Sequence, residues 1–206
     1  MVLSPPPRDA MRAAKSALRD QVLAARRRLA LAELGGLAER LADVLLQHED
    51  VRRAATVTAY VSIGREPGTS YLLDGLRAAG KRVILPVVLP DLDLDWAVYE
   101  GDASLASAGY GLLEPTGPRL GREAVATADA VLVPGLAVSA EGHRLGRGGG
   151  CYDRALGRVP VGTFTCVLLH DGEVGIDVPV EPHDRRVLAA ATPSGVVSLP
   201  PGTISS

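Results

Sequence analysis

The sequence predicts an α/β protein with a three-layer α/β/α arrangement, in which helices flank a mostly parallel central sheet. Two observations support this prediction. Short apolar segments with strand-like composition alternate with segments of helical periodicity along most of the chain. A length of 206 residues with 47% hydrophobic content is enough to bury one core. We therefore expect residues 1–206 to form a single domain, with flexible ends at about 1–8 and 200–206.

Helical segments are predicted at four places in the chain. The first is rich in Ala, Leu, Arg and Lys, contains no proline, and repeats its apolar residues at helical spacing. Thr69 or Ser70 can cap the third, and Gly80 ends it. The predicted helices cover residues of about 9–31, 31–48, 70–80 and 152–157.

Strands are predicted where β-branched and other apolar residues form short runs between these helices. Such runs are typical of buried strands in a parallel sheet. In sheets of this kind, ligands bind at the carboxyl ends of the strands. The predicted strands cover residues 55–61, 82–87, 94–99, 128–133 and 163–169, with a final short strand near Val196.

Composition excludes several classes of function. A formal net charge of -2 and 3% aromatic residues do not suit a nucleic-acid-binding surface. The chain has no apolar run near the roughly 20 residues that span a bilayer, and residues 1–8 lack the apolar core of a signal peptide. Two cysteines are too few for a disulfide scaffold. We expect a cytoplasmic protein that binds neither nucleic acid nor membrane.

The most informative segment is Arg144-Leu145-Gly146-Arg147-Gly148-Gly149-Gly150-Cys151-Tyr152-Asp153, which follows a predicted strand and opens a predicted helix. Glycines let backbone N–H groups converge on phosphate oxygens, and Arg144 and Arg147 add positive charge. Asp153, in the first helical turn, is placed to hold Mg²⁺. The segment matches neither a Walker loop nor the G-x-G-x-x-G spacing. It predicts a phosphate-binding loop, with a flexible, soluble surface loop as the alternative.

Other charged residues are candidates for the same site. Lys15 and Arg19 are four residues apart, so on a helix they share a face and can grip one polyphosphate. Glu66 lies in a loop after a predicted strand, and Asp184 lies in a proline-rigid loop. Taken alone, each of these residues is better explained as a solvated surface position.

A few residues are open to a structural or a functional interpretation. Trp96 alternates with polar positions and can face either a pocket or the core, whereas Phe164 is expected in the core. The four histidines show no metal-ligand spacing, so we expect them on the surface or in loops: His48, His143, His170 and His183.

Taken in order along the chain, these segments resemble the 5-formyltetrahydrofolate cyclo-ligase family, also called methenyltetrahydrofolate synthetases. The segment 144–153 is the most specific part of the resemblance. The matching segments are residues 15–19, 60–69, 111–115, 133–154 and 178–184.

The chain departs from the usual family pattern at three places. Cys151 stands where the family has the first of two tyrosines, and Val138-Ser139 stand where it has Phe-Asp. Leu188 occupies a position that is usually acidic. These changes bear on substrate affinity more than on reaction type, because the phosphate-binding and metal-binding groups are present.

The resemblance implies an α/β fold and a reaction that depends on ATP and Mg²⁺. The reaction converts 5-formyltetrahydrofolate to 5,10-methenyltetrahydrofolate and releases ADP and phosphate. It proceeds by phosphorylation of the formyl oxygen and attack by the folate N10. The implied partners are ATP and 5-formyltetrahydrofolate, with or without a polyglutamate tail, and the implied state is a monomer.

The resemblance also implies a role for each candidate residue. Arg147 stabilises charge on the transferred phosphoryl group, and Asp153 with Asp184 binds Mg²⁺. The folate contacts are Val61, Glu66, Arg147, Gly148, Gly149, Gly150 and Cys151. The ATP contacts are Lys15, Arg19, Arg144, Leu145, Gly146, Arg147, Gly148, Gly149, Gly150, Cys151 and Tyr152.

Two competing hypotheses belong to other functional classes. The first is a non-catalytic homologue that binds folate or nucleotide, and the presence of Lys15, Arg147, Asp153 and Asp184 argues against it. The second is a nucleic-acid-binding protein that uses the basic first helix. The net negative charge and scarce aromatic residues argue against that one.

Overall fold

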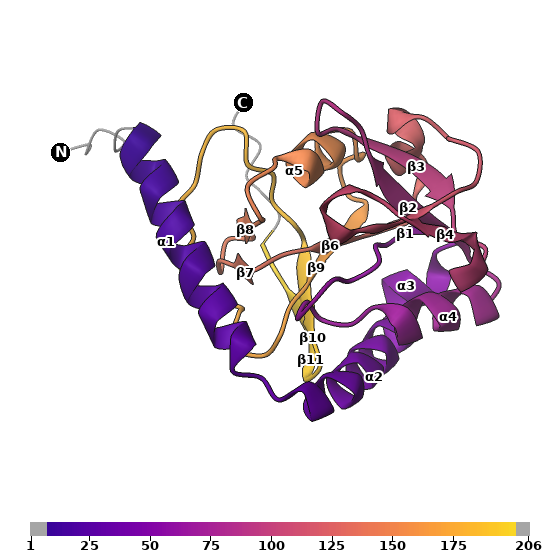
Figure 1. Ribbon diagram of the computed structural model, residues 1–206, viewed down its shortest axis with the longest axis horizontal. Coiled ribbons are helices and arrows are strands. Elements are labelled where there is room, and N and C mark those ends of the chain that lie inside the picture. The colour runs from indigo at the N-terminus through magenta and orange to yellow at the C-terminus, as the bar shows by residue number, and fades with distance from the viewer. Residues whose placement is uncertain (1–7, 201–206) are drawn as a thin grey trace.

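A seven-stranded sheet with the order β11-β10-β9-β6-β1-β2-β3 forms the centre of the protein in a computed structural model, which describes residues 8–200 (Figure 1). The ends for which we predict flexibility, residues 1–7 and 201–206, lie outside the described residues. The sheet strands are β1 Thr56–Thr58, β2 Arg82–Val88, β3 Leu94–Val98, β6 Ala130–Pro134, β9 Phe164–Leu168, β10 Ala189–Thr192 and β11 Gly195–Ser198.

The inner strands of this sheet are parallel. β1 pairs with β2 and with β6, β6 pairs with β9, and β9 pairs with β10, in each case in parallel. Only the two edge strands, β3 and β11, run antiparallel to their neighbours. The carboxyl ends of the inner strands therefore meet at one edge of the sheet, as the predicted α/β class requires.

Helices cover both faces of the sheet, which confirms the predicted layers (Figure 1). On one face, leucines of α2 and α4 join the largest core cluster with residues of β1, β2 and β9. On the other face, α5 and a 3₁₀ segment pack over a second cluster that contains Trp96, which is 1% exposed. The bounds are α2 Leu31–Gln47, α3 Glu49–Arg53, α4 Ser70–Ala78, α5 Cys151–Leu156 and η3 Arg122–Thr127.

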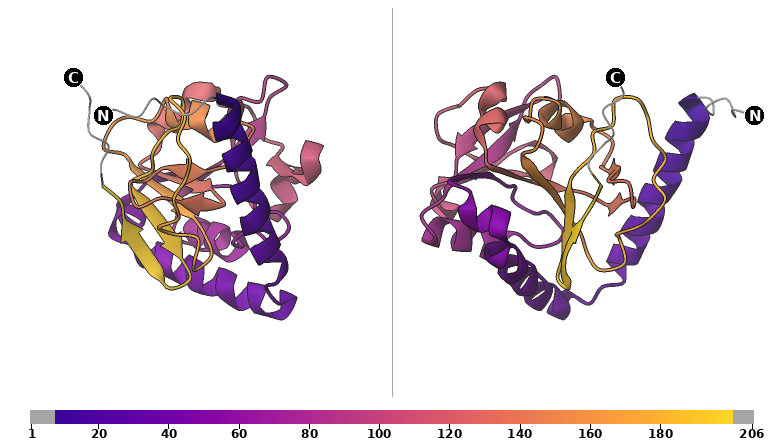
Figure 2. Two further views of the ribbon diagram at one scale, coloured as in Figure 1. Left: turned by 90° about the vertical axis from the view of Figure 1, so that its left-hand side faces the viewer. Right: turned by 180° about the vertical axis from the view of Figure 1, so that it is seen from behind.

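Helix α1 Arg8–Arg27 lies along one side of the molecule, beside the hairpin β7–β8 (Figures 1 and 2). Val22 packs there against Leu136, Leu145 and Val178 in a small third core cluster. The short strands outside the main sheet are β4 Leu105–Ser107 and β5 Leu113–Pro115, β7 Ala137–Val138 and β8 Arg144–Leu145, with 3₁₀ segments η1 Asp102–Ser104 and η2 Gly109–Gly111. No helix within residues 8–200 combines the length and apolar character that a bilayer crossing needs.

Several expectations about individual elements need correction. The strand expected over 55–61 is shorter in the structure, where β1 covers only Thr56–Thr58. Beyond it the chain turns into the next loop, and the Tyr60 carbonyl accepts a hydrogen bond from the Thr69 hydroxyl. β10 was not predicted, since its alanines have low strand propensity. His170, expected at the surface or in a loop, is in a loop but 5% exposed. Phe164 lies at the margin of the core, stacked on His48.

Candidate active site

One cavity of about 1490 Å³ lies at the carboxyl edge of the parallel strands. Its walls include Pro134 at the end of β6, Val88 at the end of β2, and Tyr60 just after β1. The site residues predicted from the sequence all line this one cavity: Lys15, Arg19, Val61, Glu66, Arg144, Leu145, Gly146, Arg147, Gly148, Gly149, Gly150, Cys151, Tyr152, Asp153 and Asp184.

The glycine-rich loop connects β8 to α5 and forms one wall of the cavity. Gly148 has φ +102° and Gly150 has φ +68°, which are conformations that only glycine adopts without strain. The Arg19 guanidinium packs against Gly148, and its Nε donates to the Gly146 carbonyl over 2.9 Å. Helix α1 is therefore fastened to this loop by a residue that the sequence predicted to contact phosphate.

Arg147 reaches from the glycine-rich loop to the loop that follows β1. Its Nε donates to Glu66 Oε1 over 2.9 Å, and the Ile63 backbone N–H donates to the other oxygen over 3.0 Å. The Glu66 side chain is 6% exposed, whereas that of Arg147 is 50% exposed. A buried carboxylate thus anchors an arginine whose guanidinium remains open to the cavity.

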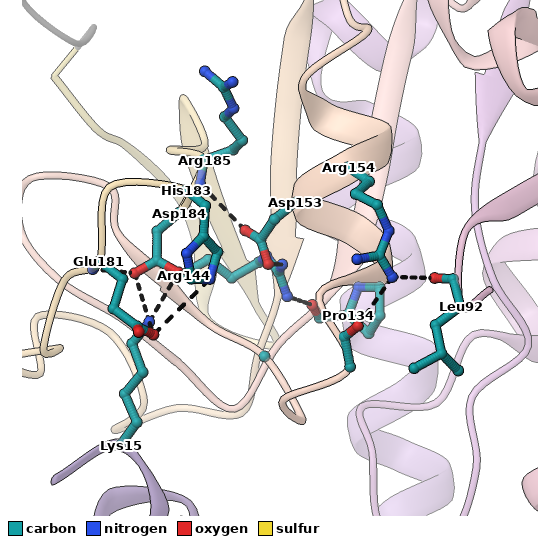
Figure 3. Close-up of polar contacts among 12 residues, drawn as sticks. Lys15, Leu92, Pro134, Arg144, Asp153, Arg154, Glu181, His183, Asp184 and Arg185 are labelled. Carbon is teal, nitrogen blue, oxygen red and sulfur yellow. Dashed lines mark hydrogen bonds and ion pairs between the residues drawn. The ribbon is translucent and has the colours of Figure 1, made fainter. Parts of the chain in front are cut away.

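Lys15 bridges two carboxylates in the same cavity (Figure 3). Its Nζ lies 2.8 Å from Glu181 Oε2 and 2.6 Å from Asp184 Oδ2. The hydrogen bond from Lys15 lowers the pKa of Glu181. With His183, these two acids form a group whose ligand atoms lie within 4.8 Å of one another. Sequence reasoning assigned no role to Glu181 or His183, although both stand in the matching segment 178–184.

Asp153, at the start of α5, is held by backbone and side-chain donors (Figure 3). Arg144 Nη2 donates to its Oδ2 over 3.2 Å, and the Arg185 backbone N–H donates to its Oδ1 over 3.2 Å. Asp153 does not join the compact group around Asp184, although both residues line the cavity. The two predicted metal ligands are therefore linked through the backbone N–H of Arg185, the residue that follows Asp184.

The remaining wall of the cavity is apolar, and sequence reasoning did not identify it. Tyr110 lies on the loop between β4 and β5 and is 81% exposed. Burial raises the pKa of Tyr60 and of Tyr152, so both phenols stay neutral. Only the segment 111–115, quoted for the resemblance, pointed to this region. The apolar lining includes Pro86, Val88, Leu92, Leu94 and Leu112.

Fold and site together define a class of protein, an α/β protein whose parallel sheet carries at its carboxyl edge a large cavity lined by arginines, a lysine and carboxylates. A family model described as the 5-formyltetrahydrofolate cyclo-ligase family matches residues 11–193. The chain belongs to this family, so the resemblance is confirmed.

Individual relatives agree with this assignment. The chain is similar to a 5-formyltetrahydrofolate cyclo-ligase of Mycolicibacterium smegmatis, with 41% identity over 90% of this chain and 97% of the relative. Identity to the protein of that name from Escherichia coli K12 is 31% over 78% of this chain and 90% of the relative. The structure of a 5,10-methenyltetrahydrofolate synthetase of Aquifex aeolicus superposes with a TM-score of 0.77 at 29% identity, covering 93% of this chain and 96% of that one.

Proposed function

We propose that this protein converts 5-formyltetrahydrofolate and ATP to 5,10-methenyltetrahydrofolate, ADP and phosphate in a Mg²⁺-dependent reaction. The observation that carries the proposal is the cavity of about 1490 Å³. It brings the cationic groups suited to a triphosphate and the apolar wall suited to a folate ring into one space. Family membership and the names of the relatives support the same reaction.

The chemistry requires activation of an oxygen that is otherwise a poor leaving group. The formyl oxygen attacks the γ-phosphorus of ATP, the bond to the bridging oxygen breaks, and ADP leaves. The folate N10 then bonds to the formyl carbon and loses its proton, and the phosphate departs with the former formyl oxygen. Phosphoryl transfer of this kind needs positioning and charge neutralisation rather than a protein nucleophile.

Arg147 is the residue best placed to stabilise the transferred phosphoryl group. Its Nε is occupied by Glu66, and within residues 8–200 its Nη groups make no hydrogen bond, so they are free to donate to phosphoryl oxygens. Lys15 and Arg19 would contribute charge from α1, and the loop that runs from Arg144 to Tyr152, which lines the same cavity, would enclose the nucleotide.

Glu66 has two proposed roles: it anchors Arg147, and it binds the folate. A buried carboxylate accepts hydrogen bonds from ring N–H groups, which suits the pterin, and Val61 lines the cavity close to it in the chain. Val61 and Glu66 therefore both come from the segment that follows β1.

Asp153 and Asp184 offer carboxylate oxygens, the ligands that Mg²⁺ prefers. The Lys15 ammonium, which lies between Glu181 and Asp184, supports the proposal that this corner of the cavity accommodates positive charge. Mg²⁺, when bound, would neutralise charge on the ATP phosphates. The side chains present therefore fit the cation.

The test is to mix purified protein with 5-formyltetrahydrofolate and Mg²⁺, with and without ATP, and to follow the absorbance of the methenyl product. We expect product only with ATP, and a loss of kcat of about 10²- to 10³-fold in Arg147→Ala. Asp153→Ala should also lose most activity. Arg53→Ala is the matched control, because this arginine is 76% exposed and pairs with Glu49 on the surface.

Wild-type turnover in both Arg147→Ala and Asp153→Ala would overturn the assigned roles. Binding of both substrates without any product, in the wild-type protein, would instead identify a non-catalytic homologue.

A further inference from the structure

Arg144 is a buried cation in the wall of the cavity. Its side chain is only 3% exposed. Nη1 donates to the Pro134 carbonyl over 3.1 Å, and Nη2 donates to Asp153 over 3.2 Å. The guanidinium also lies over the Tyr152 ring, 5.8 Å from its centroid. Each Nη atom of the guanidinium thus donates to a protein group.

Gly146 makes room for this side chain. A Cβ on Gly146 would lie 2.7 Å from Arg144 Nη1. Gly146 does not have a positive φ, so its backbone conformation does not require glycine. The close approach of Arg144 therefore accounts for this glycine of the loop.

Asp153 is the group that this arrangement orients. Arg144 holds one carboxylate oxygen and the Arg185 backbone N–H holds the other. A carboxylate has about four lone-pair sites, so both oxygens keep capacity for a further ligand. The Asp153 side chain is 16% exposed and lines the cavity. Its remaining capacity therefore lies at the cavity surface.

We infer that Arg144 is a positioning residue that fixes the Asp153 carboxylate for a divalent cation, and that it does not itself contact the triphosphate. The resemblance groups Arg144 with the ATP contacts, whereas its burial and its partners direct it to Asp153. The inference rests on the proposed function in one respect, since it takes Asp153 to face the metal. Groups that orient metal ligands typically change metal affinity by about 10- to 100-fold when they are replaced.

The experiment measures Mn²⁺ affinity by electron paramagnetic resonance in the presence of a non-hydrolysable ATP analogue. Arg144→Lys keeps the charge, but one ammonium lacks the planar fork that spans Pro134 and Asp153. We expect about 10- to 100-fold weaker Mn²⁺ binding in this variant. Binding of the analogue without metal should change less than about twofold, well below the tenfold that 1.4 kcal/mol represents.

A second variant and a double variant isolate the positioning effect. Gly146→Ala retains every charge but displaces Arg144, so we expect the same direction of change in Mn²⁺ affinity. Asp153→Asn should lose Mn²⁺ binding, and adding Arg144→Lys to it should weaken binding no further, because the two residues act as one unit. Thermal unfolding of each variant verifies that the fold is intact.

The possible results separate this inference from the proposed function. Normal Mn²⁺ affinity with weakened analogue binding in Arg144→Lys would make Arg144 a direct nucleotide contact and would overturn the inference alone. Unchanged Mn²⁺ binding in Asp153→Asn would show that Asp153 is not a metal ligand, and would overturn both the inference and that part of the proposed function.

Discussion

Helix α1 carries two buried cation–carboxylate clusters that look alike but lie in different surroundings. Towards the C-terminal end, Arg26 contacts both oxygens of Glu173 at 2.7 Å and the Gly135 carbonyl at 2.8 Å. Nearer the N-terminal end, Lys15 contacts Glu181 and Asp184. Neither Arg26 nor Glu173 lines the cavity, whereas all three residues of the Lys15 cluster do.

This difference distinguishes a structural ion pair from the cluster that we propose for ligand binding. The planar guanidinium of Arg26 matches a single carboxylate, so charge and geometry are balanced within the pair. Lys15 has one compact ammonium for two carboxylates, so its cluster keeps an excess negative charge and can exchange partners. Burial of a charge therefore does not indicate its role, but its charge balance and its access to the cavity do.

The largest expected effect is on stability, at the Arg26 cluster. Arg26→Met leaves Glu173 buried without its cation, and breaking such a pair costs about 3–5 kcal/mol of unfolding free energy. Urea denaturation measures this loss. Arg26→Met combined with Glu173→Leu should recover much of it, because the uncompensated charge is gone. A loss below about 1 kcal/mol in the single variant, typical of exposed pairs, would contradict the structural role.

The sequence predicts these two clusters unequally well. Asp184 and Lys15 stand in short segments whose order along the chain resembles a known family, so both were found. Arg26 is one of several arginines in a basic helix, and Glu173 is 147 residues away, so only the folded chain brings them together. The same limit applies to Val88 and Leu92, which look like ordinary core residues until the fold places them in the cavity wall.

The elements of the fold were likewise predictable only where the signal is local in the sequence. The parallel strands and flanking helices were predictable, because each is a local run with its own periodicity. Strand β10 was not predictable, since its alanines form a strand only because neighbouring strands bury them. The pairing of Arg144 with Asp153, nine residues apart, could not be predicted from the sequence either, because it depends on how the glycine-rich loop turns.

The next largest effect is expected on nucleotide affinity, at the Lys15 cluster. Hydrogen bonds to charged groups contribute about 1.5–3 kcal/mol, so Lys15→Met should weaken ATP binding by about 10- to 100-fold. Its loss of stability should be smaller than that of Arg26→Met, because the two carboxylates border the cavity. Calorimetric titration with a non-hydrolysable ATP analogue and urea denaturation provide the two values.

Lys15→Arg is the matched control, since it keeps the charge and should retain more affinity than Lys15→Met. Unchanged ATP affinity with a loss of stability as large as that of Arg26→Met would make both clusters structural and would remove the contrast between them.

The smallest expected effect is a pH dependence that belongs to the Lys15 cluster. Lys15 lowers the pKa of Glu181 from its ordinary value of 4.5, so the ionised carboxylate stabilises the folded protein above that pH. This contribution is lost as the pH falls from 4.5 through the lowered pKa, because Glu181 is then protonated in both states. The difference in unfolding free energy between the wild-type protein and Lys15→Met should therefore shrink over this range. Urea denaturation between pH 6 and pH 3 measures it, Glu181→Gln should show a smaller change, and a difference that grows towards acid would contradict the pairing.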